Sequence, residues 1–226
     1  MSLLPQVLFQ EADFWIIHKP AGMSFHAESQ DVGFVQWMNE HYPNQTFYPV
    51  HRLDRITSGL IILATNKVAA QEFGQLFEQH LIKKFYLALT AKKPKKKQGS
   101  IKGGMQQGRR GSWLLNQSQT NLAHTQFFSC ALKPGIRLFL LKPKTGKTHQ
   151  LRVALKSLGS PILGDERYGG GVCDRGYLHA FHLSFEWQGQ QKQYQYLPVS
   201  GDEFNGVESV LAEFGFDKPL SLAWPK

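Results

Sequence analysis

The order of apolar and polar positions along the chain predicts strands separated by a few short helices. Four consecutive aliphatic residues at 60–63 are typical of a strand buried on both faces. Strict alternation over 83–90 indicates a strand with one buried face, with Tyr86 on the face opposite its apolar neighbours. The predicted strands cover residues 7–9, 14–17, 60–63, 83–90, 123–128, 137–141 and 178–185.

Apolar residues at helical spacing predict three helices. Asn66 offers an N-cap for the first, over residues 67–80, whose apolar stripe should pack in the core. The second should follow an N-cap at Thr148 and end at Gly159. A short amphipathic helix is predicted from Val207.

The composition of the chain limits which binding partners and which cellular compartment are expected. The net charge of +9 favours a polyanionic partner, with nucleic acid the leading candidate, although charge alone does not separate RNA from DNA or an acidic membrane surface. No apolar run approaches the ~20 residues of a membrane span. Two cysteines, Cys130 and Cys173, stand outside any Cys-x-x-Cys pair, which fits a reducing compartment. We therefore expect a cytoplasmic protein that does not bind a membrane.

Neither a metal nor a nucleotide cofactor is expected. The nine histidines show no metal-ligand spacing. The segment 145–148 ends like a phosphate-binding P-loop, but Leu141 stands where that motif requires glycine.

A basic segment spans residues from about 91 to 113. It lacks acidic residues and has few apolar ones, so we expect a flexible basic excursion rather than a packed element. It is either a solvated loop or a contact for a nucleic-acid backbone, and its charge favours the second. Its basic residues are Lys92, Lys93, Lys95, Lys96, Lys97, Lys102, Arg109 and Arg110.

The stretch 51–59, His-Arg-Leu-Asp-Arg-Ile-Thr-Ser-Gly, places one carboxylate just before the predicted buried strand. Loops at the ends of such strands hold reactive groups on a rigid scaffold. Because His51, Arg52 and Arg55 lie within three residues of Asp54, its ionised form is favoured. An ionised carboxylate can act as a nucleophile or a base. The alternative is a surface carboxylate paired with arginines.

This stretch resembles the signature of the RluA-type pseudouridine synthases, and His51 stands where a sister family has Gly. Lys84-Phe85-Tyr86 and the Gly-Lys-Thr-His-Gln-Leu-Arg-Val segment at 146–153 resemble two further signatures. Two positions depart from the pattern, His18 for Asn and Ala154 for His. Shorter matches occur at Lys19–Gly22, Gly164–Gly169 and Leu178–Ala180.

The resemblance implies an α+β pseudouridine synthase fold, a mixed and mostly antiparallel central sheet flanked by helices, with an active-site cleft across the sheet. It implies a single catalytic domain over residues 1–226, without the S4-like RNA-binding module that often precedes such domains. The implied activity is isomerisation of specific uridines in tRNA or rRNA to pseudouridine, by a monomer that needs no cofactor.

The resemblance also implies roles for individual residues. Asp54 would attack the sugar C1′ or assist a glycal route, Arg152 would form an ion pair with Asp54, and Tyr86 would stack on the uracil. Arg52 would fill the space that the flipped nucleotide vacates or hold the phosphate of that nucleotide. The carboxylates of Asp165 and Glu166 are interpreted as turn formers. The expected RNA- or substrate-binding residues are His51, Arg52, Leu151, Lys92, Lys93, Lys95, Lys96, Lys97, Arg109 and Arg110.

Two other function classes stay open. One is a catalytically inactive RNA-binding protein on the same fold, against which the complete set of Asp54, Tyr86 and Arg152 argues. The other is an Asp-dependent hydrolase of nucleosides, which activity on free uridine derivatives would favour.

Overall fold

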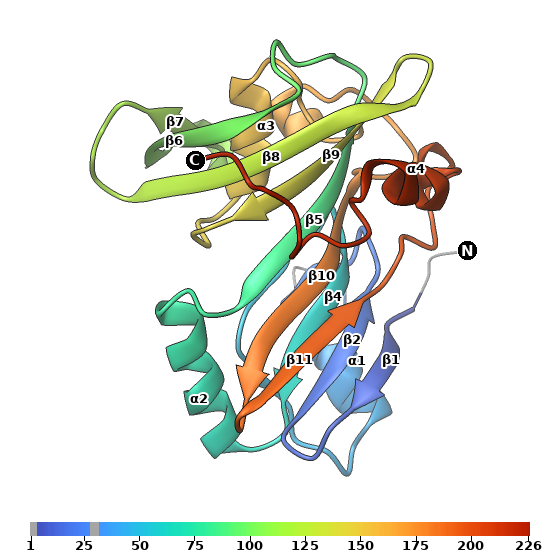
Figure 1. Cartoon of the computed structure of the whole chain (residues 1–226). Coiled ribbons are helices and arrows are strands. Elements are labelled where there is room, and N and C mark those ends of the chain that lie inside the picture. The colour runs from blue at the N-terminus through green and yellow to red at the C-terminus, as the bar shows by residue number, and fades with distance from the viewer. Residues whose placement is uncertain (1–3, 28–31) are drawn as a thin grey trace. The chain divides into compact units, whose positions relative to one another are not determined.

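The computed structural model describes residues 4–27 and 32–226, in two compact units (Figure 1). Unit 1 comprises residues 1–83 and 179–197, and unit 2 comprises residues 84–178 and 198–226. Each unit is therefore assembled from two separate segments of the chain. The expectation of one catalytic domain over residues 1–226 is not tested by this division and stays a prediction.

The described residues of unit 1 form a sheet with two helices. The sheet order is β1-β2-β4-β10-β11, with the short β3 beside β4. The β1–β2, β2–β4, β3–β4 and β10–β11 pairs are antiparallel. The elements are β1 (Gln6–Gln10), β2 (Phe14–Lys19), α1 (Phe34–His41), β3 (Tyr48–Pro49), β4 (Thr57–Ala64), α2 (Lys67–Glu78), β10 (Leu178–Trp187) and β11 (Gln190–Gln195).

The core of unit 1 lies between this sheet and α2. All eight residues of β4 are buried, as the run of aliphatic residues predicts. The side chain of Asn66 accepts a hydrogen bond from the Ala69 backbone N–H and caps α2, which confirms the predicted cap. Phe73 of α2 stacks on Trp187 at a centroid distance of 4.3 Å and meets Phe14 edge-on at 5.2 Å. These aromatic contacts fix α2 on the sheet.

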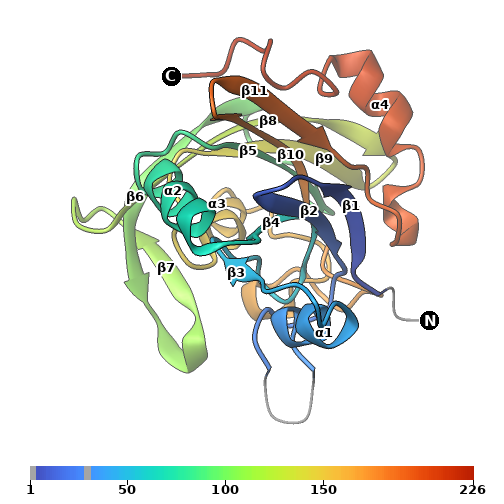
Figure 2. The same cartoon turned by 90° about the horizontal axis from the view of Figure 1, so that it is seen from below.

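Unit 2 contains a second antiparallel series, in the order β5-β9-β8-β6-β7. Figure 2 shows β6 and β7 side by side at the end of this series of strands. The elements are β5 (Lys83–Thr90), β6 (Gln98–Gln107), the short 3-10 helix η1 (Arg109–Gly111), β7 (Trp113–Asn116), β8 (Leu122–Lys133), β9 (Ile136–Pro143), α3 (Gln150–Ser157), η2 (Glu166–Tyr168), η3 (Asp202–Phe204) and α4 (Val207–Phe214).

The prediction that residues 91–113 form an excursion without a packed element was wrong for β6. Ile101, Gly103 and Met105 of this strand are buried. The glycine allows close packing, because a Cβ at Gly103 would lie 2.6 Å from the Asn116 carbonyl oxygen. The basic and glycine-rich composition concealed a strand whose buried positions are partly glycine.

Helix α3, which corresponds to the second of the predicted helices, begins one residue later than predicted. Its N-cap is His149, in the left-handed region with φ 56°, rather than Thr148. The Gln150 side-chain oxygen accepts hydrogen bonds from the Lys147 N–H and the Thr145 hydroxyl, and these bonds order the turn before the helix. Residues 150–155 are all buried, so the helix is covered on every side over this stretch.

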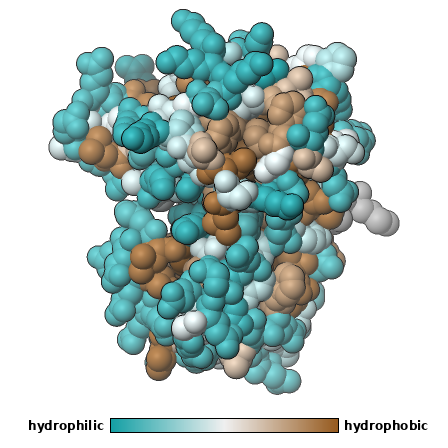
Figure 3. Space-filling view, in the orientation of Figure 1, coloured by the Kyte–Doolittle hydropathy of each residue, from teal (hydrophilic) through white to brown (hydrophobic). Residues whose placement is uncertain are grey.

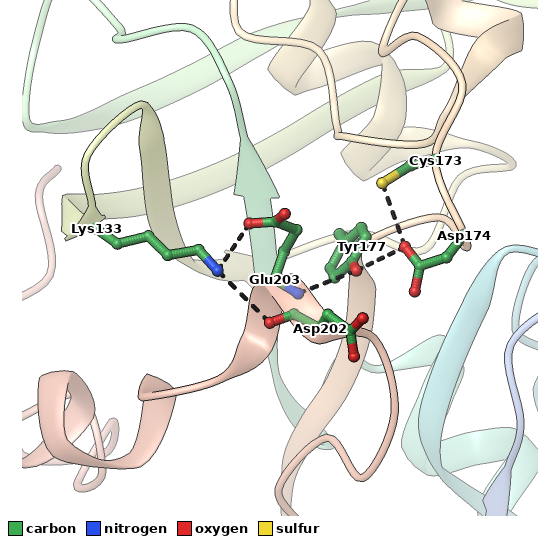
Figure 4. Close-up of polar contacts among 6 residues, drawn as sticks. All are labelled: Lys133, Cys173, Asp174, Tyr177, Asp202 and Glu203. Atoms are coloured by element: carbon green, nitrogen blue, oxygen red, sulfur yellow. Dashed lines mark hydrogen bonds and ion pairs between the residues drawn. The ribbon is translucent and has the colours of Figure 1, made fainter.

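A polar network attaches the C-terminal segment to the rest of unit 2 (Figure 4). The Tyr177 hydroxyl donates to Asp174 Oδ1 at 2.7 Å and accepts the Glu203 backbone N–H at 3.1 Å. Glu203 also pairs with Lys133 at the β8–β9 turn, at 2.8 Å. Burial raises the pKa of the Cys173 thiol, which donates to Asp174. The thiol is thus held in its protonated form, and the network is structural.

The face seen in Figure 3 is mostly hydrophilic, with apolar side chains in scattered groups. Large exposed apolar residues such as Val68 and Val172 are far apart in the sequence. No helix among the described residues has the length and apolar character needed to cross a membrane.

One buried histidine should make unit 1 sensitive to acid. Burial lowers the pKa of His182 in β10 from 6.5 to about 4. Between these values the unfolded chain binds a proton that the folded chain does not, so the free energy of unfolding falls as the pH falls through this window. We expect a loss of about 3 kcal/mol by pH 4, and a smaller loss for His182→Gln. Urea unfolding of both proteins at pH 7 and pH 4 measures this loss, and equal losses would contradict the assignment.

Candidate active site

Asp54 lies in a turn that ends where β4 begins. The Thr57 backbone N–H donates to the Asp54 carbonyl oxygen at 3.0 Å. Arg55 is joined to Gly22 twice, because its carbonyl accepts the Gly22 N–H at 2.8 Å and its Nε donates to the Gly22 carbonyl at 2.9 Å. The buried Lys19 ammonium in turn donates to the Met23 carbonyl at 2.7 Å. The half-buried Asp54 side chain therefore projects from a backbone fixed to a second turn.

The first residues of β4 are held by a buried hydrogen-bond chain. The hydroxyl of Ser58 lies 2.8 Å from Nδ1 of His179, and Nε2 of the same ring lies 2.8 Å from the Tyr196 carbonyl oxygen. Because a carbonyl can only accept, Nε2 carries the proton and Nδ1 accepts from Ser58. Gly59 follows with φ 110°, and a Cβ there would lie 2.2 Å from the Ala180 carbonyl oxygen. The Ser-Gly pair of the signature thus serves close strand packing.

His51 supports the strand from the other side. Its Nε2 accepts the Ile62 backbone N–H at 2.9 Å, and its ring stacks on Phe77 of α2 at a centroid distance of 4.7 Å. Within unit 1 these contacts indicate a structural role. The predicted role in RNA binding is not tested and stays a prediction.

Replacing His51 by Phe should separate these roles. The phenyl ring keeps the stacking on Phe77 but leaves the Ile62 N–H without its acceptor, at a cost of about 1–3 kcal/mol in the free energy of unfolding. A purely structural role would leave RNA affinity changed by less than a factor of two. Urea unfolding and equilibrium RNA binding measure the two effects. A large loss of RNA affinity with unchanged stability would establish the binding role instead.

The residues expected from unit 2 lie on β5 and α3. Tyr86 is half-buried on β5, opposite Leu141 of β9. Burial lowers the pKa of its neighbour Lys84. Arg152 lies in the first turn of α3 and is only 6% exposed, and Leu151 beside it is also buried. Asp54 belongs to unit 1, so its predicted ion pair with Arg152 and the convergence of the three residues stay predictions.

The structure gives Arg152 a partner that the sequence analysis missed. Its Nε and Nη2 donate to the two carboxylate oxygens of Asp165 at 2.7 and 2.8 Å, a two-point ion pair with Asp165 only 1% exposed. The guanidinium also lies 4.9 Å from the ring centroid of Tyr168. The interpretation of Asp165 as only a turn former was therefore incomplete. A guanidinium has five N–H donors, so this pair does not exclude a second carboxylate.

Tyr168 connects this pair to the neighbouring elements. Its hydroxyl accepts the backbone N–H of Trp113 in β7 at 2.8 Å and lies 2.8 Å from Nδ1 of His149, the N-cap of α3. Asp165 and Tyr168 belong to the Gly-Asp-x-x-Tyr-Gly segment. The match of this segment to the family pattern was the only sequence feature that pointed to these two residues. The segment positions Arg152 within unit 2.

The remaining predicted binding residues are at the surface. Arg52 is exposed, as are the five lysines at 92–97 and both arginines of η1. The described residues contain no group of three or more His, Cys, Asp or Glu side chains arranged to bind a metal.

Comparison with known proteins decides the family. Residues 13–157, well over half of the chain, match the family described as RNA pseudouridylate synthase. The chain belongs to this family. The matched region includes Asp54, Tyr86 and Arg152.

Similar proteins carry names that agree with this family. An "Uncharacterized RNA pseudouridine synthase" of Haemophilus influenzae is 48% identical over 198 residues, covering 87% of this chain and 88% of that protein. A "tRNA pseudouridine synthase C" of Haemophilus ducreyi is 32% identical, over 79% of this chain and 84% of its own. A "Ribosomal large subunit pseudouridine synthase C" of Rickettsia bellii is 34% identical over 72% of this chain, which spans only 56% of that relative.

A solved structure shares the fold. The human "RNA Pseudouridylate Synthase Domain Containing 1" aligns with a TM-score of 0.74 at 25% identity, covering 88% of this chain and 84% of its own. The expected α+β fold class and the family are confirmed. RNA pseudouridylate synthases are isomerases that act on RNA, so the enzyme class is confirmed over the non-catalytic alternative.

Proposed function

We propose that this pseudouridine synthase isomerises specific uridines of tRNA or rRNA, with Asp54 as the catalytic carboxylate. The observation that carries the proposal is the family match over residues 13–157, which contains every residue of the predicted catalytic set. Relatives bear names referring to both tRNA and ribosomal RNA, so the RNA class is left to experiment.

In the proposed reaction the uridine is first rotated out of the RNA stack, at a cost of about a few kcal/mol. Arg52 is exposed beside Leu53 and Asp54, where it can fill the vacated space or hold the phosphate of the flipped nucleotide. Asp54 then attacks C1′ or assists glycal formation. The glycosidic C1′–N1 bond breaks, the uracil turns, and C5 bonds to C1′.

The turn that carries Asp54 suits this role. It is fixed through Arg55 and Gly22 and continues into a fully buried strand, so the carboxylate is held on a rigid element. A cationic partner stabilises a half-buried carboxylate. We assign that role to Arg152, which Asp165 holds by two hydrogen bonds.

Tyr86 completes the proposed set. A phenol ring can stack on the detached uracil and retain it while it turns. The phenol oxygen is also a candidate for accepting the proton that leaves C5 at the end of the reaction, while the freed N1 gains a proton.

The exposed basic residues of segments 92–97 and 109–110 would contact the RNA backbone. Both cysteines are free of disulfide bonds, which agrees with the proposed cytoplasmic location. We also propose that the protein acts as a monomer.

The test is a map of pseudouridine in total RNA from cells with and without the gene, followed by treatment of the deficient RNA with purified protein. The proposal expects discrete uridines to lose the modification in the mutant and to regain it in vitro. Identical maps together with an inactive purified protein would refute it.

A further inference from the structure

Unit 2 contains a pocket of about 550 Å³ that the proposed catalytic set does not use. It lies between the loop before β6, strand β8 and the end of α3. Its volume is within the roughly 300–1,000 Å³ of small-molecule sites. The lining residues are Lys95, Lys96, Gly99, Ser100, Phe127, Ser157, Leu158 and Gly159.

The positive charge of the pocket lining favours an anionic ligand. Its lining includes two exposed lysines and no acidic residue. An ammonium group is a strong point-charge donor to phosphate oxygens. Lys95 and Lys96 both line the pocket, so a phosphate group bound there would lie near both side chains.

The loop that carries these lysines is anchored at both ends. The Thr90 hydroxyl donates to the Lys92 carbonyl at 3.0 Å, and the Ser129 N–H and hydroxyl both donate to the Lys97 carbonyl, at 2.6 and 3.1 Å. Pro94 between them is buried. The backbone under the two lysines is thus ordered before any ligand binds, which lowers the entropy cost of binding.

The interior of the pocket combines apolar and hydroxyl groups. Phe127 contributes to the lining although only 2% of it is exposed, and a Cβ at Gly99 would lie 3.2 Å from its ring. Leu158 adds a second apolar wall. The Ser157 hydroxyl donates to the Ala154 carbonyl, so its oxygen retains lone pairs that can accept from a ligand N–H. Apolar walls with a few oriented polar groups match a nucleobase better than a phosphate alone.

We propose that this pocket holds one unpaired nucleotide of the RNA substrate, outside the reacting centre. Its phosphate lies against Lys95 and Lys96, and its base lies against Gly99 and Leu158. Sequence-selective RNA recognition acts mainly on unpaired bases, so the pocket would help to choose the substrate. The identification of the anion as RNA rests on the proposed function.

Equilibrium binding of the intact protein to a folded RNA substrate, over a series of salt concentrations, tests the phosphate contacts. The variant is Lys95→Gln/Lys96→Gln. The matched control is Lys67→Gln/Lys218→Gln, which makes the same charge change at exposed lysines outside the basic segment. We expect the pocket variant to lose about tenfold in affinity and the slope of log K against log salt to fall by about 1–2. The control should change affinity by less than threefold.

A second variant tests the base. Gly99→Val places methyl groups in the pocket without changing the charge, and thermal unfolding verifies its fold. We expect weaker RNA binding with an unchanged salt slope. Photo-crosslinking of wild-type protein to RNA substituted with 4-thiouridine should label peptides that contain residues 95–100 or 157–159.

The outcomes are distinguishable. Equal losses in the two lysine variants would overturn the proposal in favour of general attraction. A loss of stability without a change in RNA affinity would also overturn it, since the lysines would then only balance the C-terminal dipole of α3. Binding of uridine or adenosine monophosphate that depends on Lys95 and Lys96, with RNA affinity unaffected, would identify a free-nucleotide site instead. Because binding is measured apart from catalysis, an inactive wild-type protein would refute the proposed function and leave this test intact.

Discussion

Asp54→Asn is expected to abolish pseudouridine formation while the protein still folds and binds RNA. The amide cannot act as a nucleophile or as a base toward the sugar, so the rate should fall by at least about 10³-fold, within the range that one acid–base group contributes. RNA affinity should be equal or slightly higher, because a negative charge near the phosphates is removed. Release of tritium from [5-³H]uridine-labelled RNA measures the rate.

The matched control is Asp202→Asn, which makes the same chemical change at an exposed carboxylate. It should retain full activity. Turnover above a tenth of the wild-type rate in Asp54→Asn would show that another residue performs the chemistry.

Removing the Asp165 carboxylate should give the largest loss of stability. Asp165→Ala leaves the guanidinium of Arg152, only 6% exposed, without its two-point partner. Breaking such a buried pair from one side costs about 3–5 kcal/mol. We also expect pseudouridine formation to be nearly lost, because Arg152 is no longer held in position. Urea unfolding and the tritium-release assay measure the two effects.

An exposed ion pair provides the control. Glu203→Gln breaks the pair with Lys133, whose side chains are 34% and 35% exposed, and should cost about 0–1 kcal/mol. The double variant Arg152→Met/Asp165→Leu replaces both charges by apolar groups and should recover most of the stability without recovering activity. If the double variant regained activity, the pair would be purely structural and Arg152 would have no part in catalysis.

The parts of the fold that local chemistry determines could be predicted from the sequence. The Asn66 cap of α2 and the buried strand β4 are encoded by adjacent residues, and both were confirmed. Strand β6 was missed because buried glycines such as Gly103 give no apolar signal, and their role depends on a neighbouring strand. The Asp165 partner of Arg152 was missed for a similar reason, since the contact joins a helix to a turn 13 residues away.

Only the residues that belong to the family's sequence signatures could be predicted as site residues. Asp54, Tyr86 and Arg152 were predicted from their motifs, and their joint role stays a prediction. The hydrogen bond from Ile62 to His51 and the chain from Ser58 to His179 link residues far apart in sequence. No spacing rule reveals such contacts, which nevertheless determine how the motif residues are held.

The division of each unit into two chain segments has a consequence for biosynthesis. Leu183, Phe185 and Trp187 belong to the core of unit 1 but are translated only after residues 84–178, which belong to unit 2. A ribosome-bound chain ending near residue 170 would therefore hold an unfinished unit 1, with the edge of β4 not yet hydrogen-bonded to β10. During this interval the nascent protein depends on chaperones or on rapid elongation to avoid aggregation.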